Sequence, residues 1–182
     1  MAEPPPTLAA PGLTVRLQPA VPAALLRYFA GAGDFAAALR RCGVSLPPVL
    51  GALEADGELL LAWRSPTETL CLAGSEQRIA ALAQGLGEHS DGCLLDLTGA
   101  FTVFEIRGER TADLIARLGG EGTLPGPGES RRGRLADVAV TLVCRPSGEL
   151  LLALDRGYAE HLRGWIEATM ADFPAAPGFG GA

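Results

Sequence analysis

Short apolar runs recur along this chain, and glycine or proline residues separate them from segments with helical periodicity. Apolar runs of strand length bounded by turn residues are typical of buried strands, whereas apolar residues at i, i+3, i+4 and i+7 are typical of amphipathic helices. In the first half, this pattern predicts strands at 25–30, 58–63, 68–73 and 93–97, and helices at 35–42 and 76–86. The resulting β-α-β-β-α-β order is that of a ferredoxin-like unit.

The pattern restarts after residue 100. It predicts strands at 101–107, 133–136, 138–144 and 149–154, and helices at 109–118 and 158–170. In the last helix, the spacing predicts a buried stripe of Tyr158, Leu162, Trp165, Ile166 and Thr169. The leucine runs inside several strands do not alternate with polar residues, which is typical of strands buried on both faces.

Two observations suggest an internal duplication. A strand–Gly–helix–Gly pattern occurs at 25–43 and again at 101–119, and the string GELLLA occurs at 57–62 and again at 148–153. The two offsets differ, so either the second half carries an insertion or the GELLLA match does not mark equivalent positions. The predicted fold class is α+β, with duplicated ferredoxin-like (split β-α-β) units.

Composition and pattern together divide the chain into three segments. A Pro- and Ala-rich stretch at 1–23 is expected to be flexible apart from a short strand at 14–17, and 171–182 is expected to be a flexible tail. Between them, residues 24–170 are expected to form a single domain with two related halves, at about 24–98 and 99–170. The tail phenylalanines either dock on a partner or fray with the chain end.

All 15 basic residues of the 182-residue chain are arginines, and no lysine is present. Schiff-base enzymes and nucleotide phosphotransferases that depend on a phosphate-binding lysine are therefore excluded. The net charge of −6 repels nucleic-acid phosphates, so a nucleic-acid partner is not expected. The N-terminus lacks a secretory signal pattern, and no apolar run approaches the ~20 residues of a membrane span.

The four cysteines, at positions 42, 71, 93 and 144, contain no C-x-x-C motif, and the two histidines have no metal-ligand spacing. A structural metal site is therefore not expected. Three of the cysteines lie in apolar strand-like runs, where a free thiol behaves as a small hydrophobe. These features favour a reduced, cytoplasmic protein without a membrane partner.

Four segments resemble elements of aminomethyltransferase-like proteins. They are LLLAWRSPTETLCLA (59–73), DGCLLDLTGAFTVFEIRGERTADLIARL (91–118), RRGRLADVAVTLVCR (131–145) and GELLLALDRGYAEHLRGWI (148–166). Their order and the overall size are most similar to the gamma subunits of heterotetrameric sarcosine oxidases, over roughly residues 23–170. The resemblance implies the aminomethyltransferase N-terminal fold, with duplicated ferredoxin-like units.

The resemblance also implies a role. Gamma subunits of this family carry no catalytic residues and bind no cofactor themselves, whereas FAD, FMN, NAD and tetrahydrofolate belong to the larger alpha- and beta-type flavoprotein subunits. The complex oxidatively demethylates an N-methyl amino acid and passes the one-carbon unit to tetrahydrofolate. Two alternatives are a stand-alone folate-binding aminomethyltransferase-like protein and a ferredoxin-like interaction or regulatory domain of another complex.

Few residues are candidates for chemistry. Arg131, Arg132 and Arg134 form a basic cluster that either contacts an acidic partner or is a solvated strand end, and both readings are favoured over a small-molecule clamp. Asp96 lies within an apolar strand and is a candidate for binding folate, although a turn cap or an arginine partner explains it better. No catalytic residue is predicted.

Overall fold

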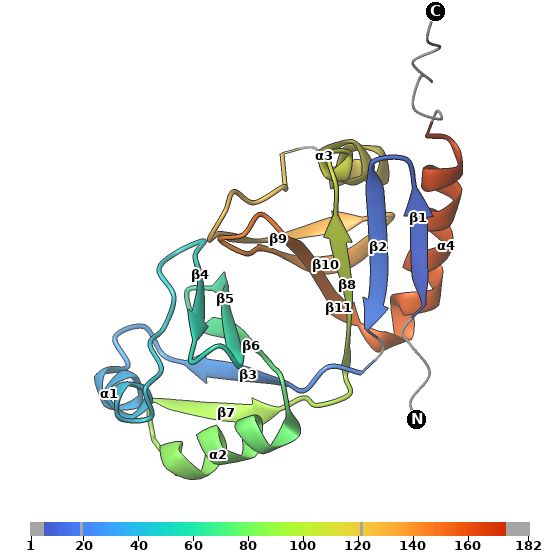
Figure 1. Cartoon of the computed structure of the whole chain (residues 1–182). Helices are drawn as coiled ribbons and strands as arrows, with labels where there is room; N and C mark the ends of the chain where they lie inside the picture. The colour runs from blue at the N-terminus through green and yellow to red at the C-terminus, as the bar shows by residue number, and fades with distance from the viewer. Residues whose placement is uncertain (1–5, 19, 121, 174–182) are drawn as a thin grey trace, which may run out of the picture.

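The computed structural model describes residues 6–18, 20–120 and 122–173, which form two antiparallel sheets and four α-helices (Figure 1). The first sheet has the strand order β4-β5-β6-β3-β7, and the second has the order β1-β2-β8-β11-β10-β9. The predicted α+β class is confirmed.

The first sheet comprises β3 (Ala23–Tyr28), β4 (Ala52–Ala55), β5 (Leu59–Ser65), β6 (Glu68–Ala73) and β7 (Gly92–Asp96). The second comprises β1 (Thr7–Ala10), β2 (Leu13–Gln18), β8 (Phe101–Arg107), β9 (Ser130–Leu135), β10 (Val138–Cys144) and β11 (Leu150–Asp155).

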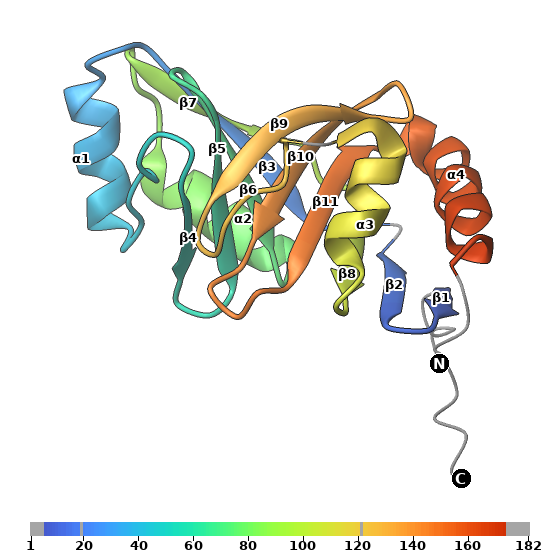
Figure 2. The ribbon, with the colours of Figure 1, turned by 90° about the horizontal axis from the view of Figure 1, so that it is seen from above.

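The helices cover the outer faces of the two sheets. They are α1 (Gly33–Arg41), α2 (Glu76–Leu86), α3 (Thr111–Ile115), which a π-helical turn at Ala116–Gly120 extends, and α4 (Ala159–Ala171), which a 3-10 turn at Arg156–Tyr158 precedes. Figure 2 shows α1 on one side of the molecule, α3 and α4 on the opposite side, and the sheets between them. No helix of the described residues is both long and apolar enough to cross a membrane.

Each sheet is buried on both faces, as the leucine runs predict. In β5, Leu59 and Leu61 pack toward the helices, whereas Leu60 and Ala62 pack into a core shared with the second sheet. Strand β11 shows the same alternation, because Leu151 lies in that shared core. A fully buried leucine contributes about 1.5–3 kcal/mol to folding, so the face-to-face packing holds the two sheets together.

The two sheets have matching strand orders. Every strand of the first sheet has a counterpart in the second when the order β4-β5-β6-β3-β7 is aligned with the order β9-β10-β11-β8-β2. Three successive pairs of elements start 78 residues apart. They are β3 and β8 (Ala23 and Phe101), α1 and α3 (Gly33 and Thr111), and β4 and β9 (Ala52 and Ser130). Strand β2 therefore takes the place of β7, and the outer edge of β7 has no strand corresponding to β1.

This correspondence decides between the two readings of the GELLLA repeat. Residues 57–62 lead into β5, whose counterpart is β10, whereas residues 148–153 lead into β11. The repeated string therefore does not mark equivalent positions. The order predicted for the second half is confirmed, with β10 and β11 joined by a turn and the last helix after β11.

The N-terminal segment is more ordered than its composition suggests. A strand was expected at 14–17, and β2 contains it, but the expectation of flexibility elsewhere in 1–23 is wrong for β1, which pairs with β2. Leu13, Val15 and Leu17 alternate with exposed residues and are buried in the core of the second sheet. This period-2 pattern outweighs the Pro- and Ala-rich composition, since one apolar face can pack on a sheet.

Two expectations near the C-terminus are also corrected. Leu162 and Ile166 of α4 are buried as predicted, but Tyr158 and Trp165 are exposed, and Ala159 and Met170 complete the buried face. The tail was expected to begin at 171, but Phe173 is buried in the core of the second sheet, and its ring lies 5.3 Å from the Arg110 guanidinium carbon. Residues 174–182 of the expected tail lie outside the described part of the chain.

Candidate functional site

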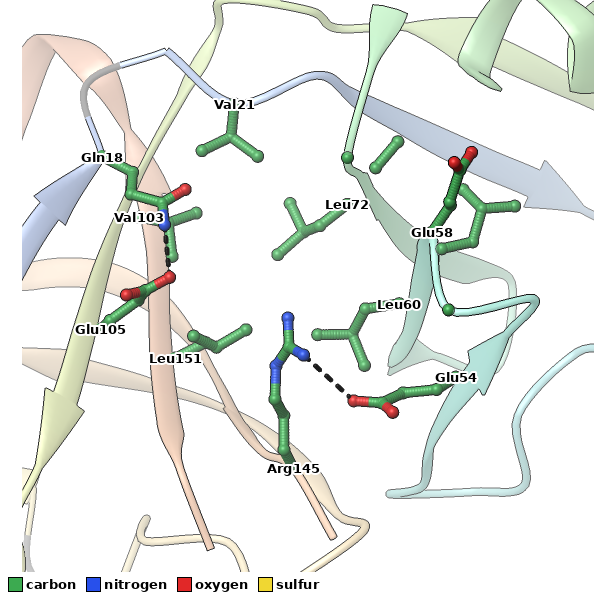
Figure 3. A pocket seen from close by; sticks show the side chains of 14 residues that line it. Gln18, Val21, Glu54, Glu58, Leu60, Leu72, Val103, Glu105, Arg145 and Leu151 are labelled. Carbon is green, nitrogen blue, oxygen red and sulfur yellow. Dashed lines mark hydrogen bonds and ion pairs between the residues drawn. The ribbon is translucent and has the colours of Figure 1, made fainter. Parts of the chain in front are cut away.

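A cavity of about 170 Å³ opens at the seam between the two sheets. Its apolar floor comes from both sheets and includes Leu60 and Leu72 of the first and Val103 and Leu151 of the second (Figure 3). Its polar rim consists of Gln18, Glu54, Glu58, Glu105 and Arg145. Most of these polar residues lie at strand ends and in the adjoining turns, where charged side chains reach solvent without entering either core.

Arg145 is the one cation of this rim and points into the cavity (Figure 3). It follows β10 directly, and a tight turn holds it, because its backbone N–H donates to the Glu149 carbonyl at 2.8 Å and its own carbonyl accepts from the Gly148 N–H at 2.8 Å. Its Nη1 lies 3.3 Å from Glu54 Oε1 on β4. Arg145 therefore ties the second sheet to the first.

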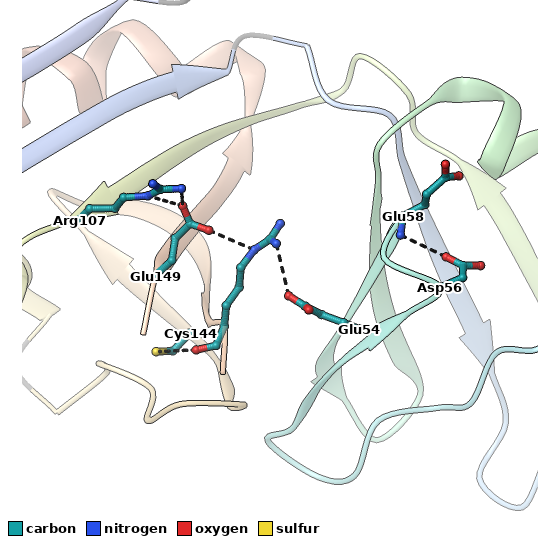
Figure 4. Close-up of polar contacts among 7 residues, drawn as sticks. Glu54, Asp56, Glu58, Arg107, Cys144 and Glu149 are labelled. Atoms are coloured by element: carbon teal, nitrogen blue, oxygen red, sulfur yellow. Dashed lines mark hydrogen bonds and ion pairs between the residues drawn. The ribbon is translucent and has the colours of Figure 1, made fainter. Parts of the chain in front are cut away.

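A chain of alternating charges extends from this contact (Figure 4). Arg145 Nε lies 3.3 Å from Glu149 Oε2, and Glu149 Oε1 accepts a hydrogen bond from Arg107 Nε at 2.5 Å. Arg145 Nε is buried and makes no hydrogen bond among the described residues, so its contact with Glu149 is a Coulombic pair only. Since the Arg145 and Glu54 side chains are partly exposed, each such pair contributes about 0–1 kcal/mol.

The rim of the cavity has an excess of negative charge. Glu54, Glu58 and Glu105 face one guanidinium, Arg145, and Glu105 accepts a hydrogen bond from Gln18. This balance favours a cationic group and repels an anion. At about 170 Å³ the space is also below the ~300–1,000 Å³ of typical ligand pockets. The cavity therefore suits water or one small cationic group.

The structure does not bring the predicted arginine cluster together as a clamp. Arg131 forms an ion pair with Glu129 at 3.2 Å. The pKa of Glu129 is lowered, mainly by a hydrogen bond from the Gly126 backbone N–H and then by Arg131. Arg134 donates to the Asp137 carbonyl at 2.5 Å. Successive side chains of a strand point to opposite faces, so Arg131 lies on one face of β9 and Arg132 and Arg134 on the other.

Asp96 lies at the end of β7 and is exposed. Its Oδ1 accepts a hydrogen bond from the Thr98 N–H at 2.9 Å, so the carboxylate caps the turn that follows the strand. This is the turn-capping alternative considered for the residue. Asp96 is not among the residues that line the seam cavity.

The four cysteines are free thiols. Burial raises the pKa of Cys71 to about 12, and burial followed by the negative charge of Glu129 raises the pKa of Cys144. Both thiols are therefore poor nucleophiles and poor metal ligands at neutral pH. Among the described residues, no group of three or more His, Cys, Asp or Glu side chains is arranged to hold a metal ion.

A second hollow, of about 410 Å³, lies beside β7 and is lined in part by Phe29, His89 and Cys93. His89 Nε2 lies 2.8 Å from the Leu86 carbonyl oxygen, and its ring meets Phe35 edge-on with ring centroids 5.9 Å apart. These contacts occupy the imidazole at the end of α2. His89 and Cys93, which are four apart in sequence, both line this hollow.

Sequence reasoning missed the seam residues. Arg145 and Glu54 are 91 positions apart, and each is an ordinary charged residue beside a turn. Only Arg145 has a signal in the sequence, because it directly follows the apolar strand β10, whereas Glu54 lies in the short strand β4. That position becomes informative only when the packing of the two sheets is known.

The architecture defines the class of fold. Aminomethyltransferase T of the glycine cleavage system from Bartonella henselae is similar, with a TM-score of 0.59, 12% identity and coverage of 80% of this chain and 43% of that chain. The chain is also similar to a chain of the heterotetrameric sarcosine oxidase from Corynebacterium sp. U-96, with a TM-score of 0.75, 22% identity and coverage of 93% of this chain and 89% of that chain. No protein-family model matches the sequence, and no curated protein matches it. The two likenesses establish an aminomethyltransferase-like fold.

Proposed function

We propose that this chain is the small, gamma-type subunit of a heteromeric, sarcosine-oxidase-like flavoprotein complex. The observation that carries the proposal is the near-complete correspondence with a chain of a heterotetrameric sarcosine oxidase, which covers 93% of one chain and 89% of the other. The aminomethyltransferase likeness, in contrast, covers 43% of that enzyme. The complex would demethylate an N-methyl amino acid oxidatively and pass the one-carbon unit to tetrahydrofolate.

Within this proposal, the chain contributes to assembly and leaves the chemistry to larger subunits. FAD, FMN, NAD and tetrahydrofolate would bind to alpha- and beta-type partners. The residues of the seam cavity do not fit tetrahydrofolate, because about 170 Å³ and a surplus of carboxylates suit neither a pterin ring nor an anionic glutamyl tail. This mismatch counts against folate binding at the seam cavity.

The internal organisation is part of the proposal. The matching strand orders and the 78-residue offset of the first three pairs of elements support a duplicated pair of ferredoxin-like units within one domain. The halves proposed at about 24–98 and 99–170 need one amendment, because β1 and β2 belong to the sheet of the second half. The second unit is then completed by a strand from the N-terminus.

The proposal is tested by co-expression of the full chain with the larger, alpha- and beta-type flavoprotein subunits of the same organism. We expect a stoichiometric complex that elutes as one species with flavin absorption, whereas the chain alone shows none. A chain that stays a stable monomer and does not associate with those subunits would contradict the proposal. Association with an unrelated, flavin-free complex would favour the regulatory-domain alternative.

A further inference from the structure

Strand β5 contains a β-bulge at Arg64. Trp63 pairs with Thr69 and Ser65 pairs with Glu68, so Arg64 is an extra residue between two consecutive pairs of the ladder. Bulges redirect a side chain away from the regular alternation of a strand and are common beside functional sites. The bulge therefore takes the Arg64 side chain out of the regular alternation of β5.

The Arg64 side chain reaches from the first sheet to the second. Its guanidinium carbon lies 5.9 Å from the centroid of the Phe101 ring on β8. The side chain is half-buried, and its Nε is buried without a hydrogen-bond partner among the described residues. Glu68 is the nearby carboxylate, but it already ion-pairs with Arg27 at 3.1 Å.

This arrangement differs from that of four other half-buried arginines. Arg78, Arg131, Arg145 and Arg163 each have a carboxylate within 3.3 Å. Arg64 has none within 4.0 Å in the described part of the chain. A half-buried guanidinium is costly when no anion compensates for the water it has lost.

A second positive charge lies beside Arg64. The Ser130 hydroxyl donates to the Trp63 carbonyl at 2.8 Å, which places β9 against the end of β5. Two residues further along, on the same face of β9, is the exposed Arg132. Burial and then the charge of Arg132 lower the pKa of Arg64, against a smaller opposing effect of Glu68. Arg132 also makes no ion pair within the described residues.

We propose that Arg64 and Arg132 form a docking site for a carboxylate side chain, Asp or Glu, of a partner protein chain. The inference rests on the proposed function, which supplies that partner. A carboxylate between the two guanidiniums would relieve their repulsion and could accept hydrogen bonds from their terminal Nη groups, with the Phe101 ring beside Arg64. The site lies at an exposed seam between the sheets, so it fits a projecting side chain of a second protein.

The test compares the affinity of full-length variants for the flavin-containing larger subunits. Arg64→Met keeps the length of the side chain and its contact with Phe101 but removes the charge, and we expect it to weaken binding about tenfold. Arg132→Gln is expected to weaken binding less, because Arg132 is more exposed. Arg41→Gln, on an exposed arginine of α1 in the other helix layer, is the matched control and should bind like the wild type.

Stability of the free chain provides a second readout. Because Arg64 is desolvated and repelled without compensation, Arg64→Met should unfold at the same temperature as the wild type or at a higher one, while its affinity falls. A variant that loses affinity and stability together would indicate a structural role and overturn the proposal. Wild-type affinity in Arg64→Met would overturn it as well.

Two further outcomes separate the sources of failure. If the wild-type chain does not bind the flavoprotein subunits, the proposed function fails and the docking site with it. If the wild type binds and Arg64→Met binds equally well, only the docking site fails. Titration of the free chain with acetate, followed by NMR of the Arg64 Nε–H, should show no saturation, since tight saturation would identify a small-anion site instead.

Discussion

Replacing Ser130 by alanine tests how strongly the two sheets are tied at their edges. Ser130 is completely buried on β9, and its hydroxyl donates to the carbonyl of Trp63 on β5 at 2.8 Å and to that of Gly51, just before β4, at 3.0 Å. One proton serves both acceptors, and the Gly51 carbonyl also accepts from the Trp63 N–H at 3.0 Å. The substitution therefore removes one shared hydrogen bond and leaves at most one carbonyl less well satisfied.

The expected loss for Ser130→Ala is about 1–2 kcal/mol of unfolding free energy. In a domain of this size, that corresponds to a fall in melting temperature of roughly 2–8 °C. Urea denaturation should show a lower midpoint with an unchanged slope. Ser147→Ala, in the exposed turn before β11, is the matched control and should lie within about 0.5 kcal/mol of the wild type.

Hydrogen exchange locates the effect. The Ala52 N–H donates to the Gly128 carbonyl at 2.8 Å and the Ser130 N–H donates to the Leu50 carbonyl at 2.8 Å, so these amides report on the same edge. In Ser130→Ala they should lose more protection than amides in the centre of either sheet. Wild-type stability in the variant, or uniform loss of protection, would refute the idea that this hydroxyl joins the sheets.

Three further predictions concern other parts of the molecule. At pH 8, iodoacetamide should alkylate the exposed Cys93 but spare Cys71, whose pKa is raised by burial to about 12, until urea unfolds the chain; mass spectrometry detects each adduct. Gly108→Ala should lower the urea midpoint strongly, because its φ is +129° and a Cβ would lie 2.2 Å from a backbone oxygen of the β1–β2 turn. A hydrogen bond from Arg78 is the main cause that lowers the pKa of Asp56. The ionised Asp56 carboxylate therefore stabilises the fold above its ordinary pKa of 3.8, and this stabilisation is lost as the pH falls through the lowered pKa. The difference in melting temperature between wild type and Asp56→Asn should vanish below that lowered pKa.

The first half of the fold was predictable because its signals are local. Ser75 caps α2 by accepting from the Arg78 N–H at 3.3 Å, and the buried Ile79, Leu82 and Leu86 follow at helical spacing. The hairpin of β5 and β6 has its turn at Pro66. In such segments, nearest neighbours in sequence decide the structure.

The missed features depend on contacts between distant segments. Strands β1 and β4 have four residues each and no strong apolar alternation, so only their partners make them strands. The adjacent arginines of β9 were singled out as a cluster, yet the pleat sends Arg131 and Arg132 to opposite faces. Arg64 drew no attention, because a bulge in the ladder and the approach of Phe101 from the other sheet have no signature in the linear sequence.

Strand β2 has a consequence for how the chain is synthesised and folded. Its pairing with β8 joins residues 85 to 93 positions apart, from Gln18 with Val103 to Thr14 with Arg107. At a translation rate of about 5–20 residues per second, β2 waits roughly 4–19 seconds for its partner to be made. During that interval its apolar side chains are exposed, and the first sheet, whose strands all lie between the two, can fold before β2 finds its place. The order of synthesis therefore favours folding the first unit early, and the second unit closes last by recruiting a strand made before the first unit.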